Sequence, residues 1–304
     1  MKTYNQTKEG QGRFKANKTH FYHFSKLIQK LYGSNLGAAY GEICKQMTGL
    51  KIDHIDADDK TLDVIRKNLL DAWNTEHVNY LLSGMNVSDQ ISANQWKIIH
   101  LYYSVYYLLR ALYCVYKKEE EVEHRNVLGF ISSGIQAGKI SLINPWNYIY
   151  LSKSKEHFRN FPKDFSFKVS RSWEIKVPSA QNMAAWLMNT SKKKGRKKKK
   201  EIPPVSLFDC LYRMRKWSNY RAGEDILSGK TQSSFKQDVT ELCEDINFVM
   251  SSTLGLLEMF IIRLIGQKQM LIIYEKCKKY FSLNSIKNDQ LTTRMQVFLQ
   301  NDLK

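Results

Sequence analysis

Apolar residues recur every three or four positions along most of the chain, and this spacing is the period of an amphipathic α-helix. The segments with this pattern are 23–32, 56–82, 94–118, 206–227, 233–266 and, more weakly, 268–304. Only five prolines occur in 304 residues, so few positions break a helix. The pattern predicts a mainly α-helical protein.

Two of these segments are apolar on nearly all sides. Aromatic and aliphatic residues cover most of the surface of 94–118, which predicts a helix at the centre of a bundle. Arg110 lies inside it and must meet an acid or reach an edge, because an unpaired buried guanidinium is costly. The run Phe248–Ile262 contains Glu258 and is shorter than the roughly 20 apolar residues of a membrane-spanning helix. We therefore expect a buried core helix there.

The pattern changes between residues 151 and 204. Apolar and polar residues alternate from Phe165 to Val169 and again from Trp173 to Val177, which predicts a short β-hairpin. Ser179 is placed to cap a short helix, and Lys192–Lys200 carries eight positive charges in nine residues. We interpret the whole stretch as a basic α/β insertion in a helical domain.

These patterns divide the chain into five parts. They are a basic flexible arm at 1–22, the first part of a helical bundle at 23–150, the α/β insertion with its Lys-rich linker at 151–204, the second part of the bundle at 205–265, and a C-terminal helical extension at 266–304.

The charge balance predicts a polyanionic partner. Lys and Arg number 47 against 29 Asp and Glu, a formal net charge of +18, which favours nucleic acid first and an anionic membrane surface second. Two tryptophans, Trp173 and Trp186, lie close in sequence to the lysine run. They either stack on the bases of a single-stranded nucleic acid or anchor the insertion to the bundle. The candidate nucleic-acid-binding residues are Lys192, Lys193, Lys194, Arg196, Lys197, Lys198, Lys199, Lys200, Arg171 and Lys176.

Metal and cofactor chemistry has little support in the sequence. The five cysteines include no Cys-x-x-Cys pair, and the polar N-terminal residues contain no apolar signal segment; both features favour the reducing cytoplasm. His20 and His23 are three residues apart but have no third ligand at a metal-site spacing, so we interpret them as surface residues of the arm. Common catalytic and nucleotide-binding motifs are absent, and we expect no metal and no cofactor.

Two segments carry polar residues in a distinctive order. Residues 102–131 join an aromatic helix with a central arginine to a charged loop and then to a histidine that opens the next helix, and residues 211–227 carry an arginine followed by an Asn-Tyr-Arg triplet. This order resembles HEPN domains, which are helical bundles of toxin–antitoxin pairs, abortive-infection proteins and other phage-defence systems. The matching positions are Tyr103, Tyr106, Tyr107, Arg110, Ala111, Leu112, His124, Arg215, Ser218, Asn219 and Tyr220.

The resemblance implies metal-independent cleavage of RNA. Active HEPN ribonucleases place an arginine and a histidine a few residues apart on one helix, and the two act on the 2′-hydroxyl and the scissile phosphate at a dimer interface. In this chain no histidine follows Arg215, and the one Arg–His pair at that spacing, Arg13 and His20, lies in the predicted arm. The candidate catalytic residues are therefore His124, Arg110, Arg215, Arg221, Asn219 and Tyr220.

A structural interpretation stands beside the catalytic one. In it His124 packs or caps the start of its helix, and the arginines pair with Glu119–Glu123, Glu224 or Asp225, since ion-pair networks often resemble sites.

We expect a cytoplasmic, HEPN-like effector that acts on RNA as a metal-independent endoribonuclease in a toxin or anti-phage defence system. The alternative is a non-catalytic nucleic-acid-binding or dimerisation subunit of a larger defence complex. A peripheral membrane toxin that uses the 248–262 helix is a third hypothesis, opposed by Glu258 and Arg263. The expected partners are RNA or another nucleic acid, a second copy or a larger complex, and an antitoxin or regulatory partner, with no membrane.

Overall fold

The computed structural model describes residues 8–85, 87–119, 122–151, 157–167, 179–191, 203–221, 232–283 and 289–300. These residues are mainly helical, which confirms the prediction of a mainly α-helical protein. The helices are α1 (Lys8–Tyr32), α2 (Leu36–Thr48), α3 (Asp59–Ser83), α4 (Val87–Lys117), α5 (His124–Gln136), α6 (Ala180–Ser191), α7 (Leu207–Arg221), α8 (Gln232–Ile265), α9 (Gln267–Leu283) and α10 (Asp289–Gln300), and the strands are β1 (Ile149–Tyr150) and β2 (Phe158–Arg159).

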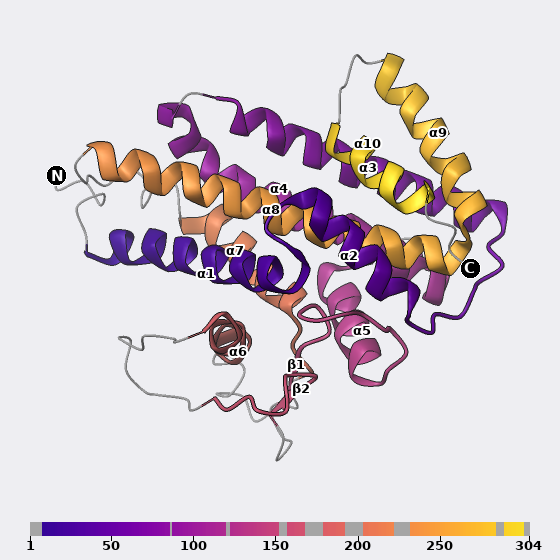
Figure 1. Ribbon diagram of the computed structural model, residues 1–304, viewed down its shortest axis with the longest axis horizontal. Helices are drawn as coiled ribbons and strands as arrows, with labels where there is room; N and C mark the ends of the chain where they lie inside the picture. Colours follow the sequence, from indigo (N-terminus) through magenta and orange to yellow (C-terminus); the bar gives the residue numbers. More distant parts are fainter. Residues whose placement is uncertain are drawn as a thin grey trace.

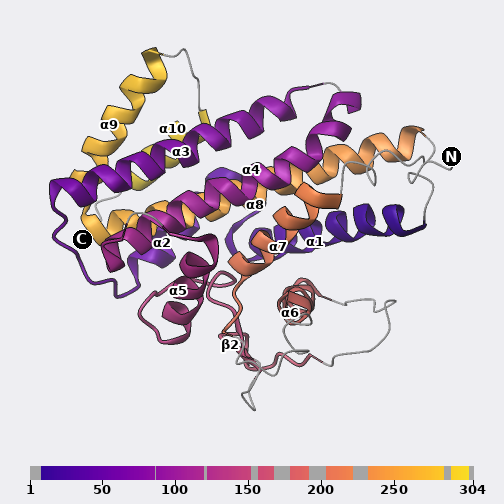
Figure 2. The same cartoon turned by 180° about the vertical axis from the view of Figure 1, so that it is seen from behind.

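Helices α4 and α8 run side by side through the centre of the bundle (Figure 1, Figure 2). Helix α3 packs along α4, helices α1 and α2 pack against α8, and α5 and α7 cover another part of α4. Leu108 and Leu109 of α4 and Leu254 and Leu257 of α8 have no exposed surface. The prediction of a central helix at 94–118 is confirmed, although the helix begins earlier, at Val87.

Among the described residues, two helices have the length and apolar composition of membrane spans, Trp96–Lys117 and Gln237–Ile265. The most apolar windows of these two segments are 78% and 94% buried inside the protein. Both helices therefore form the core, as predicted for Phe248–Ile262, and that run is not available to a membrane.

Helix α1 begins at Lys8, so the prediction of a flexible arm at 1–22 is wrong for residues 8–22. Phe21, Phe24, Leu27 and Ile28 are buried and pack α1 against α8 and α6. The sequence pattern did not predict helix in residues 8–18, because these residues are mostly polar. Apolar residues recur at helical spacing only in the second half of α1, so the full helix has no amphipathic period.

The small sheet lies earlier in the chain than the predicted hairpin. Tyr150 pairs with Phe158 in an antiparallel register, whereas Phe165 and Phe167 belong to no strand and instead pack their rings on Phe158 at 5.7 and 5.6 Å between centroids. Residues 168–178 lie outside the described residues. The alternation around Phe165 thus coincides with aromatic contacts, and the remainder of the predicted hairpin, including Trp173 and Val177, lies outside the described residues.

Residues 151–204 begin next to Tyr150 and end beside the same residue, at Val205. The Tyr150 N–H donates to the Val205 carbonyl at 2.9 Å, and the Val205 N–H donates back at 3.1 Å. Between them, α6 packs on α1 and α7. The predicted cap of α6 is confirmed, since the Asn182 N–H donates to Ser179 Oγ at 3.2 Å.

A fully buried ion network joins α3, α8 and α10. The Arg294 guanidinium donates to both carboxylate oxygens of Glu76 at 2.7 Å, and its Nε donates to Glu258 Oε2 at 2.8 Å. None of these three side chains is exposed. Burial alone would lower the pKa of Arg294, but the charges of Glu258 and Glu76 raise it well above its ordinary value, so the guanidinium stays charged.

Neutral donors complete the network. Trp73 Nε1 donates to Glu258 at 2.7 Å, and Ser251 Oγ donates to Glu76 at 2.8 Å. Two carboxylates and one guanidinium leave one negative charge, which these hydrogen bonds stabilise. A Cβ atom at Gly255 would lie 3.4 Å from Arg294 Cδ and 3.2 Å from the Tyr40 ring, so glycine is the residue that fits on α8 at this contact.

Replacing Arg294 with methionine leaves two buried carboxylates without their cation. We expect Arg294→Met to lower the free energy of unfolding by about 3–5 kcal/mol, because the uncompensated charge keeps its desolvation cost. Urea denaturation measures this difference.

The control is Arg66→Met, which removes a partly exposed ion pair with Asp63 at 2.6 Å and should cost less than about 1 kcal/mol. The triple variant Glu76→Gln, Glu258→Gln, Arg294→Met should regain part of the lost stability, since no buried charge remains. Wild-type stability in Arg294→Met would contradict the role of the network.

Candidate functional site

His124 opens α5 and lies against tyrosines of α4. Its Nδ1 is 2.7 Å from the hydroxyl oxygen of Tyr102, and its ring centroid is 4.0 Å from that of Tyr106. These tyrosines are one helical turn apart and so project from the same side of α4. The Tyr106 hydroxyl also donates to the Val122 carbonyl at 3.2 Å, which holds the chain before α5 against α4.

Helix α7 completes the cluster. Tyr212 stacks beside His124 with ring centroids 5.9 Å apart and an interplanar angle of 20°. Arg215 donates through Nη2 to the Tyr103 hydroxyl at 2.5 Å, and its guanidinium lies 5.0 Å from the Tyr103 ring centroid. Lys216 Nζ lies 4.8 Å from the Tyr212 centroid. Spacings of three and four residues place these α7 side chains on one face.

Three cations act on the imidazole. Partial burial lowers the pKa of His124, and the positive charges of Arg215, Arg110 and Lys216 lower it further. His124 is therefore held in its neutral form at neutral pH, because burial and like charges both disfavour the imidazolium.

Arg110 lies half-buried near an edge of the bundle, and its charge acts on groups of three helices. It lowers the pKa of Tyr106 of α4, against the larger effect of burial, and that of His124 of α5. It also acts on Asp71 of α3, an exposed acid within electrostatic range. The sequence required Arg110 to meet an acid or reach an edge, and its side chain is partly exposed, with Asp71 as an acid on which its charge acts.

The arrangement suits an anion with an ionisable hydroxyl beside it. When Nδ1 carries the proton and donates it to Tyr102, Nε2 holds a lone pair and can accept a proton from a ligand. Burial raises the pKa of Tyr102, so its phenol stays protonated and orients the ring. The cations of Arg215 and Arg110 suit a phosphate oxygen. In the described part of the chain, no group of three His, Cys, Asp or Glu residues is arranged to hold a metal ion.

The structure brings together some of the predicted site residues. His124 and Arg215 share one tyrosine cluster, and the charge of Arg110 acts on the same imidazole. Asn219, Tyr220 and Arg221 lie in the last turn of α7, where only the backbone is described. The predicted nucleic-acid-binding residues Arg171 and Lys176 and the run Lys192–Lys200 lie outside the described residues.

The sequence interpretation omitted three members of the cluster: Tyr102, Tyr212 and Lys216. The available signal was spacing, since Tyr102 lies four residues before Tyr106, and Tyr212 lies three and four residues before Arg215 and Lys216. That spacing places each set on one face, but which faces meet depends on tertiary packing.

His20 is not a surface residue of an arm, so that interpretation was wrong. It is 3% exposed, packs on Trp186 of α6 with ring centroids 5.1 Å apart, and lines a small cavity with Met183 and Leu207. Burial lowers its pKa to about 3, and the charge of Arg213 adds to the shift. It is a neutral core histidine.

Arg215→Met should raise the pKa of His124 toward its ordinary value, because the cation that most strongly opposes the imidazolium is removed. NMR titration of the imidazole measures the shift. Arg66→Met, on α3, is the matched control and should leave the titration unchanged. An unaltered His124 pKa in Arg215→Met would show that the two side chains do not interact electrostatically.

His20 should make stability depend on pH. Since its folded pKa is lowered from 6.5 to about 3, the unfolded chain binds a proton that the folded chain does not. Stability should therefore fall with decreasing pH between about 6.5 and 3, by about 1.4 kcal/mol per unit from this group, and show no such term above that range. His20→Leu should flatten this slope in urea denaturation across pH, whereas the exposed-site control His54→Leu should keep it.

Comparisons of this chain with protein-family models, curated proteins and solved structures gave no match in any of the three.

Proposed function

We propose that this protein is a cytoplasmic, HEPN-like effector that cleaves RNA without a metal ion, with His124 as the general base. The observation that carries the proposal is the His124 ring, which lies 2.7 Å from the Tyr102 hydroxyl and stacks beside Tyr212. Arg215 lies over the Tyr102 ring, and burial together with the charges of Arg215 and Arg110 lowers the pKa of His124. The packing of α4 against α7 also supports it, since those helices hold the two segments that resemble HEPN domains.

The chemistry requires one base and at least one cation. Nε2 of His124 takes the proton of the ribose 2′-hydroxyl, and the resulting oxygen attacks the adjacent phosphorus. The bond to the 5′-oxygen breaks, the leaving oxygen takes up a proton from water, and a 2′,3′-cyclic phosphate remains. Arg215 and Arg110 stabilise the charge that develops on the phosphoryl oxygens.

The same reasoning selects RNA over DNA. The nucleophile is the 2′-hydroxyl, which DNA lacks, and a base with a lowered pKa is in its active form at neutral pH. In this proposal the half-exposed rings of Tyr103 and Tyr212 contact the nucleotides next to the scissile bond, as aromatic residues do in single-strand binding.

A second candidate is a non-catalytic nucleic-acid-binding subunit of a larger defence complex. It is favoured by the hydrogen bond between Arg215 and Tyr103, which already engages one guanidinium group, and by the lack of a histidine after Arg215 in the sequence. In both versions the protein acts as a homodimer or within a larger assembly, under the control of an antitoxin or regulatory partner.

The purified protein should degrade total RNA in EDTA and leave DNA intact. His124→Ala should lower the rate by about 10²–10⁴-fold, and Arg215→Met by about 10²–10³-fold, as expected for a lost oxyanion donor. The end group is diagnostic, because the mechanism yields a 2′,3′-cyclic phosphate that mass spectrometry detects.

His23→Ala is the matched control, since His23 is a partly buried histidine of α1 outside the cluster. It should cleave at the wild-type rate. Intact RNA together with a gel shift that weakens steeply with salt would support the binding subunit instead. Deleting Lys192–Lys200 should then flatten the salt dependence, because phosphate contacts set its slope.

A further inference from the structure

The outer face of α9 combines lysines with exposed aliphatic side chains. The inner face is buried against the bundle and consists of Met270, Ile273, Tyr274, Cys277 and Phe281. On the opposite face a stripe of exposed residues repeats about once per helical turn. Its members are Lys268, Ile272, Lys276, Lys279 and Leu283.

The exposure of the apolar members is large for a folded protein. Leu283 is 77% exposed and Ile272 43%, and Leu271 and Tyr280 flank the stripe at 45% and 42%. Grouped apolar residues on a surface usually mark an interaction site, whereas single ones need no explanation.

The charge of α9 is strongly positive. Four lysines and one glutamate give it a net charge of +3 (4 − 1). Glu275 pairs with Lys278 at 3.8 Å, so the positive charge that remains is that of the three stripe lysines.

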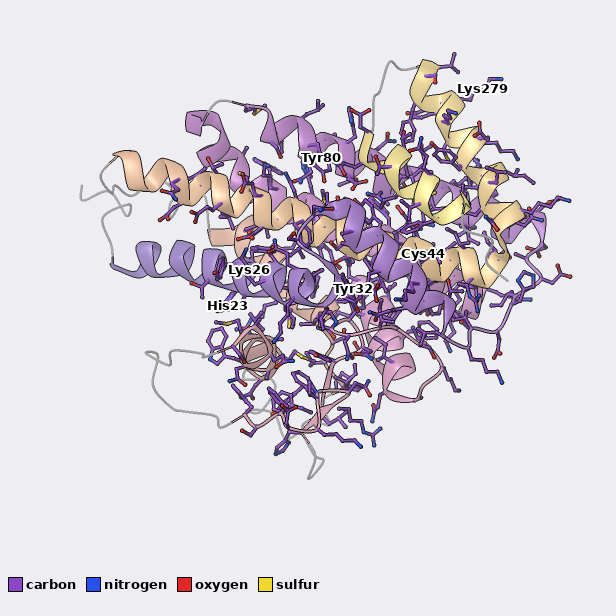
Figure 3. The ribbon with its side chains drawn as sticks, viewed as in Figure 1. His23, Lys26, Tyr32, Cys44, Tyr80 and Lys279 are labelled. Carbon is purple, nitrogen blue, oxygen red and sulfur yellow. The ribbon has the colours of Figure 1, made fainter. Side chains whose placement is uncertain are left out.

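Helix α9 also projects from the bundle. Its far end rises away from α3 and α8 in both views (Figure 1, Figure 2), and Lys279 lies on its outer side (Figure 3). Helix α5, which holds His124, lies on the other side of α4 and α8 from the projecting end of α9 in both views. A surface that bound α9 would leave His124 clear.

We propose that the stripe Lys268, Ile272, Lys276, Lys279, Leu283 docks this protein on the surface of an anionic lipid bilayer. Lysines on an amphipathic helix gain from acidic headgroups, and the aliphatic side chains between them gain from insertion at the acyl boundary. The sequence alone led us to expect no membrane partner, because its most apolar run is the core helix α8.

Nucleic acid fits this face less well. Phosphates attract lysines, and bases stack on aromatic rings, but neither gives a role to Ile272 or Leu283. A bilayer uses the charges and the aliphatic groups together. The two ligands therefore make different predictions for substitutions that change only the aliphatic residues.

The test is flotation of the full-length protein with phosphatidylcholine vesicles that contain or lack phosphatidylserine. Binding should require phosphatidylserine. Ile272→Ser/Leu283→Ser keeps every charge and should weaken the partition coefficient about a hundredfold. The variant with Lys268, Lys276 and Lys279 changed to Gln should also weaken it about a hundredfold, at about fivefold per lysine.

Matched controls separate this helix from the general basicity of the chain. Changing the exposed Lys51, Lys139 and Lys163 to Gln removes the same charge elsewhere, and Val78→Ser/Leu81→Ser removes exposed apolar groups from α3. Both controls should keep most of the binding. Thermal unfolding by circular dichroism checks that each variant is folded.

Three results would overturn the proposal. They are no flotation of the wild-type protein with anionic vesicles, equal losses in the α9 variants and their controls, and vesicle-free self-association that Ile272→Ser/Leu283→Ser abolishes. The last result would assign the stripe to contact between copies of this chain. RNA binding or cleavage should not change in Ile272→Ser/Leu283→Ser, so the outcome is independent of the function proposed for His124.

Discussion

Arg294 reaches from α10 into the interior of the bundle and there meets Glu76 of α3 and Glu258 of α8. These residues come from distant parts of the chain, and the three helices must pack so that each buried charge meets its hydrogen-bond partners. Desolvation offsets much of the attraction in a buried ion pair, so the network fixes the relative positions of the helices more than it adds net stability. A shift of one helical turn in any of the three helices would leave a charge without its partner.

This constraint extends to the candidate site through α3 and α8. Helix α4 lies along both of them, and its fully buried Lys97 donates to Ser83 at the end of α3. Fixing α3 and α8 therefore fixes the rotation of α4 about its axis. That rotation decides whether Tyr102 and Tyr106 face α5 and α7, and so whether His124 has its neighbours. The site is in this sense a consequence of packing at the core.

The sequence predicted the helical elements better than their contacts. The central position of α4 and the burial of α8 follow from apolar residues on all sides, which is a local signal. The helical state of residues 8–22 and the pairing of Tyr150 with Phe158 were missed, because the first depends on burial of one end of α1 and the second on contacts across the insertion. His124, Arg110 and Arg215 were identified from their order, but Tyr212 and Lys216 join them only through tertiary packing. Glu258 stood out as an acid in an apolar run, yet nothing local identified Arg294 as its partner.

Arginine has different roles in the core and at the candidate site. Around Arg294 two carboxylates more than balance the guanidinium, so its positive charge is neutralised where it lies. Arg215 instead hydrogen-bonds a neutral phenol, which satisfies a donor without cancelling the charge, and that field acts on His124 and lowers its pKa. A phosphate placed between these groups would offset the cations, and the negative charge that grows on it during attack by a 2′-hydroxyl would favour the imidazolium still more. The proton affinity of His124 would therefore rise as the reaction proceeds. The positive charges that keep His124 neutral in the free protein would then not oppose proton uptake, because the bound anion offsets them.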